Sequence, residues 1–208
     1  SPGDGTFNFR ALLWTRSGSG HTVLDLGTLP GGAAAQARAI NAAGDVVGYS
    51  EIAMAGGVIR KHGFLRRLSG MRLDLVPANG YLDAEANDVN ASGVVVGVSY
   101  TPIQSGATSR VATVWRPASQ GSNTLLPLIL PGGYYSAATA LNDAGAIVGT
   151  IRIAGSPTLT HLARWQVVGG SVEDLSPSDL DVRPYDVGPS GLIVGERKVS
   201  GNFSAFVF

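Results

Sequence analysis

The sequence predicts an all-β fold: a β-propeller-like array of four four-stranded repeats of about 50 residues each, closed by the N- and C-terminal strands. Three observations carry this prediction. A glycine-rich segment recurs four times, an aromatic-tipped segment follows each copy, and no stretch of useful length has helical periodicity. Small sheets repeated at this period cannot bury both faces alone, and they stack on their neighbours as propeller blades do. A β-solenoid is the rival, but its coils are usually shorter.

The first and second strands of each repeat flank the glycine-rich segment. Its four copies span residues 40–48, 89–97, 141–149 and 187–195. In three copies an asparagine precedes a short turn that ends in glycine, which suits a tight turn with positive φ and an asparagine bonded to its own turn. The β-branched residues after the turn predict a buried second strand.

The third and fourth strands follow at near-constant distances. The third-strand copies are residues 62–66, 111–115, 161–165 and 204–208, and an extra copy lies at 10–14; the fourth-strand copies are 24–26, 73–75, 126–128 and 173–175. We therefore expect one repeat domain over residues 1–208. Its units are about 27–78, 79–128, 129–175 and 176–208, preceded by N-terminal strands at 7–26.

The strand types also predict how the array closes, because the chain both begins and ends on a third-type strand. We expect residues 7–26 to pair in the same sheet as residues 184–208 and so to hide the open edges. The alternative is an open arc whose ends join further repeats or neighbouring chains, so self-association through edge strands stays open.

Four segments resemble a known repeat family. They are DLGTLPGG at 25–32, AIN at 39–41, VVG at 46–48 and HGFL at 62–65, and together they resemble the bacterial extracellular HAF repeat, named for a His-Ala-Phe triplet. The resemblance covers nearly the whole chain and is weakest over 176–208. It implies a bacterial, exported protein at the cell surface or outside the cell, and it brings no catalytic or binding residues with it.

Composition argues against several classes of function. The 15 basic residues balance the 15 acidic ones, so no basic footprint for nucleic acid is expected. No apolar stretch reaches the length of a membrane-spanning helix. The absence of cysteine excludes disulfides, thiol catalysis and cysteine-based metal sites.

No set of residues predicts an enzyme, a cofactor or a resident metal. His62 and His161 occupy equivalent repeat positions, which places them on different repeats, and we expect them and His21 to be structural or solvent-facing. The acidic run from Asp83 lacks the carboxylate that a calcium loop needs at its twelfth position, Val94. A looser calcium site there, or at Asp179, Asp181 and Asp186, stays open. The recurring aromatics Trp14, Trp115, Trp165 and Phe208 are expected to pack between repeats.

The candidate binding surface is the face with long, dissimilar loops, because binding residues tend to lie on variable loops above a rigid scaffold. Those loops are 27–36, 76–85, 129–137 and 176–184, with 51–61, 100–110, 151–160 and 198–203 beside them. The residues that we expect near the axis are Gln36, Arg38, Tyr81, Asp83, Glu85, Asn87, Tyr134, Tyr135, Arg183 and Tyr185. Tyrosines with arginines and carboxylates suit a glycan or a protein surface.

We therefore expect a non-enzymatic, exported binding or adhesion module. A structural segment of a longer surface array is the second hypothesis. A polysaccharide-acting enzyme with paired carboxylates is the third.

Overall fold

The computed structural model is all-β, as predicted. It describes residues 9–102, 108–117, 123–128, 133–153, 160–167, 171–176 and 181–208. Within these ranges the chain forms seventeen strands and one short 3-10 turn, and no helix has the length and apolar character to cross a membrane.

The strands group into four repeats in chain order, of which repeats 2 and 3 share one eight-stranded sheet. Repeat 1 contains β3 (Ala35–Ile40), β4 (Val46–Ala53), β5 (Ile59–Arg66) and β6 (Arg72–Leu75). Repeat 2 contains β7 (Asp83–Val89), β8 (Val95–Pro102), β9 (Thr108–Pro117) and β10 (Asn123–Leu128), and repeat 3 contains β11 (Gly133–Leu141), β12 (Ala146–Ile153), β13 (His161–Gln166) and β14 (Val172–Asp174). Repeat 4 has three strands in the described residues, β15 (Val182–Val187), β16 (Ile193–Val199) and β17 (Asn202–Val207). Within each repeat, consecutive strands pair antiparallel.

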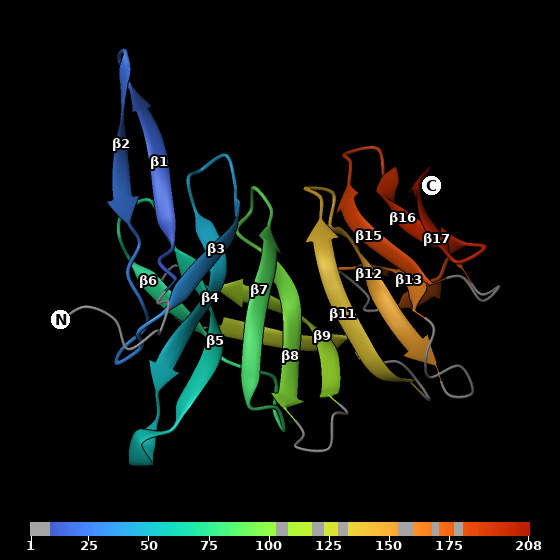
Figure 1. Cartoon of the computed structure of the whole chain (residues 1–208), viewed down its shortest axis with the longest axis horizontal. Coiled ribbons are helices and arrows are strands. Elements are labelled where there is room, and N and C mark those ends of the chain that lie inside the picture. The colour runs from blue at the N-terminus through green and yellow to red at the C-terminus, as the bar shows by residue number, and fades with distance from the viewer. Residues whose placement is uncertain are drawn as a thin grey trace.

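The repeats stack in sequence order, and their first strands β3, β7, β11 and β15 lie side by side across the molecule (Figure 1). The hydrophobic core lies between successive repeats. One cluster joins Val47 and Leu65 of repeat 1 to Val89 and Trp115 of repeat 2, and similar clusters join repeats 2 and 3 and repeats 3 and 4. One parallel pairing, Tyr135 with Arg110, also links the sheets of repeats 2 and 3. Each repeat therefore depends on its neighbour for burial.

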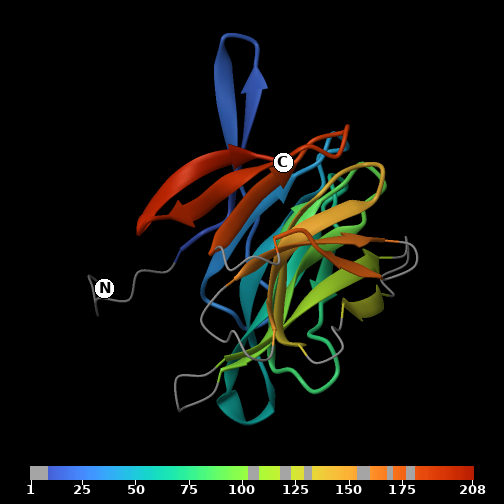
Figure 2. The ribbon, with the colours of Figure 1, turned by 90° about the vertical axis from the view of Figure 1, so that its right-hand side faces the viewer.

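The predicted closure is wrong. The N-terminal strands β1 (Leu12–Ser17) and β2 (Gly20–Asp25) form a separate two-stranded sheet, and β17 pairs only with β16 among the described strands. Figures 1 and 2 show the hairpin standing away from the repeats, at the opposite end of the stack from repeat 4. The base of the hairpin is held on repeat 1. Ala11 and Leu26 pack in one cluster with Ala35 of β3, and Ala35 N donates a hydrogen bond of 2.8 Å to Phe9 O. The array is an open arc.

The repeated turns have the predicted backbone. Their glycines, at 44, 93, 145 and 191, have φ of 79°, 77°, 86° and 87°. As expected, each asparagine closes its own turn: Asn41 Oδ1 accepts from Asp45 N at 2.9 Å, and Asn90 and Asn142 make the same bond at 3.0 and 2.9 Å. Positive φ and the side-chain acceptor together explain the Asn–Gly spacing.

The second glycine of each segment has a different role. Every first strand carries a β-bulge opposite it, between Ala37 and Ala39 in repeat 1 and at matching positions in the other repeats. A Cβ at position 48, 97, 149 or 195 would lie 1.9, 2.0, 2.0 or 2.3 Å from a carbonyl oxygen of that strand. Only glycine allows the bulged strand to approach so closely.

The same asparagines also join the repeats. Asn41 Nδ2 donates to Asn90 O at 2.9 Å, Asn90 Nδ2 to Asn142 O at 3.4 Å, and Asn142 Nδ2 to Gly188 O at 2.9 Å. We call this series the asparagine ladder. It crosses all three junctions between repeats and ends at Gly188, which has no side chain to continue it.

Replacing Gly149 with alanine should destabilise the fold by about 3 kcal/mol, because the new Cβ overlaps the Ala137 carbonyl of the bulge. Urea unfolding measures the loss. Gly20→Ala is the matched control: its Cβ meets nothing closer than 3.7 Å, so a change within about 0.5 kcal/mol is expected. Equal effects of the two changes would contradict the packing role of Gly149.

Asn142→Asp tests the ladder, because it keeps the acceptor for Ala146 N and removes the donor to Gly188 O. The carboxylate then faces a carbonyl oxygen, and we expect a loss of about 2 kcal/mol at pH 7. The facing carbonyl raises the pKa of the introduced carboxyl in the folded state. The loss should therefore shrink below about pH 4, where the protonated acid can donate. Exposed Asn202→Asp is the control, and a pH-independent loss would argue against the ladder bond.

Candidate functional site

The bulges place one variable side chain from each repeat at the same point of the first strand. The residues that the register skips there are Arg38, Asn87, Thr139 and Tyr185. Bulges re-aim side chains and often lie beside functional sites. Three of these four residues belong to the predicted binding set, and all four lie at the same β-bulge of their repeats.

Arg38, Glu85 and Asn87 meet across the junction of repeats 1 and 2. Arg38 Nη2 lies 2.6 Å from Glu85 Oε2, and its Nη1 donates to Asn87 Oδ1. Asn87 Nδ2 in turn donates to Ala138 O of repeat 3 at 2.7 Å. The arginine also lies over the Tyr49 ring, 5.1 Å from its centroid. These three predicted residues therefore converge, and they also connect the repeats.

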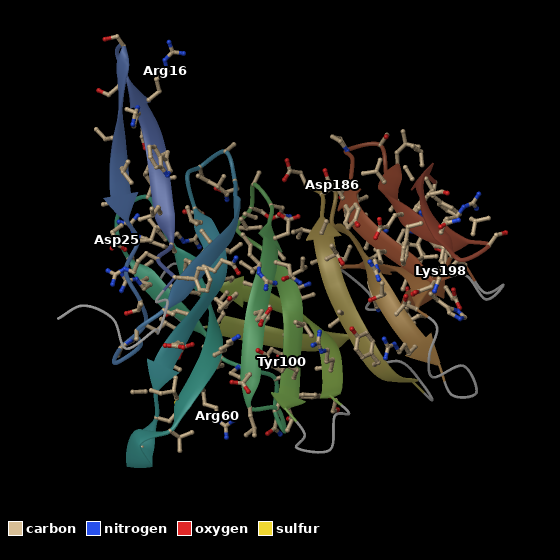
Figure 3. The ribbon with its side chains drawn as sticks, viewed as in Figure 1. Arg16, Asp25, Arg60, Tyr100, Asp186 and Lys198 are labelled. Carbon is tan, nitrogen blue, oxygen red and sulfur yellow. The ribbon has the colours of Figure 1, made fainter. Side chains whose placement is uncertain are left out.

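A second group is a row of alternating tyrosine and arginine on directly paired positions of β8, β9, β11 and β12. Arg110 lies 5.5 Å from the Tyr100 ring and 5.8 Å from the Tyr135 ring, and Arg152 lies 4.6 Å from the Tyr135 ring. The Tyr100 hydroxyl, labelled on β8 in Figure 3, donates to Glu85 Oε1 at 3.0 Å. Burial and then the negative charge of Glu85 raise the pKa of Tyr100.

Of this row, sequence reasoning selected only Tyr135. Tyr100 and Arg152 each lie three residues after the second glycine of their repeat. This shared spacing indicates that they occupy equivalent positions, and it could have identified both from the sequence. Arg110 had no such signal, because its place depends on the parallel pairing of β9 with β11.

The remaining members of the predicted set are spread over the arc. Arg183 Nη1 donates to Glu196 Oε1 at 3.0 Å and lies 4.2 Å from the Phe203 ring, and a hydrogen bond with Glu196 raises the pKa of exposed Tyr185. Asp83 is buried and accepts from Lys61 N at 2.7 Å. Gln36 is exposed on β3, Tyr81 is half-buried in the loop before β7, and the side chain of Tyr134 lies outside the described residues. Most of the set thus lies on first strands, where the loop-based prediction did not put it.

Parts of the predicted variable loops, residues 103–107, 129–132, 154–159 and 177–180, also lie outside the described residues.

The histidines at the third-strand position are structural, as predicted. His62 Nδ1 lies 2.8 Å from Asp74 Oδ1, and His161 Nδ1 lies 2.8 Å from Asp174 Oδ2, each pair within its own repeat. Both imidazoles are buried. In repeat 2 the corresponding positions are Val111 and Pro127, and in the N-terminal hairpin Arg10 and Asp25 form an ion pair there.

The recurring aromatics follow the prediction only inside the array. Trp115 and Trp165 are fully buried, whereas Trp14 and Phe208 are exposed at the two ends. The expectation of packing between repeats is therefore wrong for the terminal copies, because the arc gives them no second neighbour.

The described residues contain no group of three histidines or carboxylates close enough to hold a metal ion, and Asp179 lies outside them. The Asp88 oxygens accept from Val89 N at 2.8 Å and Leu141 N at 2.9 Å, so this carboxylate serves the junction of repeats 2 and 3. Burial raises its pKa, and the charges of Asp186 and Asp143 act in the same direction.

A pocket of about 210 Å³ lies between the turns of repeats 2 and 3, lined by Asn90, Ser92, Val94, Asp143, Ala144, Gly145, Gln166 and Val167. It opens at the short, uniform turns, a part of the fold that the sequence prediction did not select for binding.

Comparison with known proteins places the fold. No family model matches the chain, and no curated protein matches it. A puromycin-hydrolysing peptidase of Mycobacterium tuberculosis is similar in structure, with a TM-score of 0.59 and 16% identity over 98% of this chain and 37% of the peptidase. TolB from Acinetobacter baumannii gives a TM-score of 0.40 and 14% identity over 95% of this chain and 56% of TolB. The chain therefore spans little more than a third of the peptidase, and its all-β fold is similar to that of this β-propeller-containing protein.

The raised pKa of Tyr100 predicts a pH-dependent stability. Its hydrogen bond contributes fully below the ordinary tyrosine pKa of 10.0, and that contribution is lost as the pH rises through the raised folded value. Tyr100→Phe should cost about 1 kcal/mol at pH 7, and the difference from the parent should narrow at pH 11. Urea unfolding at both pH values measures this, with Tyr81→Phe as the control. A constant difference would contradict the role of the hydroxyl.

Proposed function

We propose that the chain is an exported, non-enzymatic binding or adhesion module that contacts a glycan or a protein surface through its first strands. The observation that carries the proposal is the set of bulge positions, where one repeated backbone presents Arg38, Asn87, Thr139 and Tyr185. A constant scaffold with variable side chains is typical of recognition surfaces. The resemblance of residues 25–66 to the HAF repeat supports a bacterial protein at the cell surface or outside the cell.

The chemistry of this surface suits a hydroxyl-rich or mixed polar partner. Tyr185 offers an apolar ring and a hydroxyl, Arg183 lies two residues before it, and both are exposed. Tyrosine and arginine are also the residues that most often dominate the binding energy of interfaces. The side chains of Arg38 and Glu85 are 32% and 18% exposed, against 55% for Arg183. We therefore assign the main ligand contacts to the more exposed side chains of repeat 4, which share Glu196 as a partner, and to Gln36.

Two other functions rank below this one. A structural role within a surface array is favoured by the uncovered ends of the arc. A polysaccharide-acting enzyme ranks third, because Glu85 accepts from both Arg38 and Tyr100 and buried Asp83 accepts from a backbone N–H.

A glycan array and a panel of extracellular proteins, probed with purified chain, test the proposal. Tyr185→Ala and Arg183→Ala should each weaken binding at least about tenfold and leave the melting temperature within about 2 °C, because both side chains are exposed. Leu68→Ala, in the exposed turn between β5 and β6, is the control and should bind as the parent does. Binding that survives both substitutions would contradict the assigned surface. A silent array would favour the structural role, and hydrolysis of a polymer would favour the enzyme.

A further inference from the structure

The two ends of the arc expose the residues that the internal junctions bury. Each internal junction contains the same pair of apolar residues in one cluster. The first is the valine directly before the second glycine of one repeat. The second is the residue directly before the turn asparagine, or before Gly188 in repeat 4, of the next repeat. These pairs are Val47 with Val89, Val96 with Leu141, and Val148 with Val187. The fourth pair of this series has no partner within the chain. It would be Val194 of repeat 4 with Ile40 of repeat 1.

Exposure shows how complete the contrast is. Ile40 is 54% exposed, whereas its equivalents Val89, Leu141 and Val187 are 4–5% exposed. Val194 is 41% exposed, whereas Val47, Val96 and Val148 are each 0% exposed. The hairpin covers Ala35 of repeat 1 but leaves Ile40 open, because the hairpin consists only of third- and fourth-type strands.

We propose that a second copy of this chain covers these surfaces, with β15 and β16 of one copy packing against β3 of the next as first and second strands do at the internal junctions. At the internal junctions each of these surfaces is covered by the surface of the other kind. Another copy of this chain carries both surfaces, so it can cover both. The end surfaces belong to opposite ends of one open arc, and the hairpin is anchored beside repeat 1 (Figure 1). The contact is therefore head-to-tail, and it builds rings or chains of copies.

A polar contact supports the same pairing. Asp88 accepts from its neighbour Val89 through Oδ1 and from Leu141 N of the next repeat through Oδ2. Asp186, labelled in Figure 3, occupies the equivalent position in repeat 4 and accepts from Val187 N through Oδ1 at 2.8 Å. The backbone N–H equivalent to that of Leu141 is the one of Ile40. Asp186 Oδ2 of one copy is thus placed to accept from Ile40 N of the other.

Strand edges are exposed at both ends as well. Val207 and Phe208 of β17 are exposed, and among the described strands β17 pairs only with β16 and β2 only with β1. Both edges are open to pairing with another strand. One internal bond is not reproduced, because Gly188 has no side-chain amide that could donate to Asn41 O of the other copy. This junction is therefore weaker than those inside the chain, and the association is reversible.

Sedimentation velocity over a range of concentrations tests the inference on the full chain. The parent should associate as concentration rises, and Ile40→Asp and Val194→Asp should each remain monomeric, because each places a charge in the apolar contact. Asp186→Ala should weaken association about tenfold. Val58→Asp, an equally exposed valine in the β4–β5 loop, is the control and should associate as the parent does.

Mixing the two charged variants gives the sharpest outcome. The Ile40→Asp chain keeps an intact repeat 4 surface and the Val194→Asp chain keeps an intact repeat 1 surface, so the mixture should form dimers and nothing larger. A parent that is monomeric at all concentrations would overturn the inference. If the parent is monomeric and Ile40→Asp and Val194→Asp, but not Val58→Asp, lower the melting temperature, then the two ends contact each other within one chain. Association unaffected by either charge would also overturn it. None of these outcomes depends on the ligand proposed for the first strands.

Discussion

The asparagine ladder is the constraint on which the arrangement of the repeats depends. One side chain makes two bonds with opposite roles: its oxygen closes the turn of its own repeat, and its amide reaches the turn carbonyl of the next. The local turn and the spacing between repeats are thus fixed by the same residue. Two of the three asparagines, Asn90 and Asn142, are buried, so losing either bond would leave a polar group without compensation.

The bulged first strands follow from a second constraint that acts together with the ladder. In repeats 1 to 3 the ladder asparagine holds the start of the second strand, and in all four repeats the second glycine lets the first strand bulge over it. The bulge residue is freed from sheet pairing, so its identity can change without disturbing the ladder. This separation explains how Arg38 bonds to the next repeat while Tyr185, at the same position, bonds to Glu196 of its own repeat.

Sequence reasoning succeeded where the determining interactions are local. The turn glycines, the order of the strands and the structural histidines all follow from residues a few positions apart, or from repeats compared with one another. It failed where the cause lies on another strand. The need for glycine at position 97 comes from the Glu85 carbonyl, and the place of Arg110 comes from a parallel pairing with Tyr135. Counting strand types could not reveal that Ala11 and Leu26 anchor the hairpin on repeat 1, so the predicted ring came out as an arc. The positions of the candidate site were selected in part, but their contacts across repeats were not.

The ends of the arc show that a repeated residue has no fixed environment of its own. Trp14 and Trp115 occupy the same repeat position; the first is exposed and the second is fully buried. Trp115 packs against strands of repeat 1, whereas no described strand covers Trp14 in this way. Burial in such an array is therefore a property of junctions, and each junction needs two complementary faces. In this chain Ile40 and Val194 occupy such face positions in the first and the last repeat, and both are exposed.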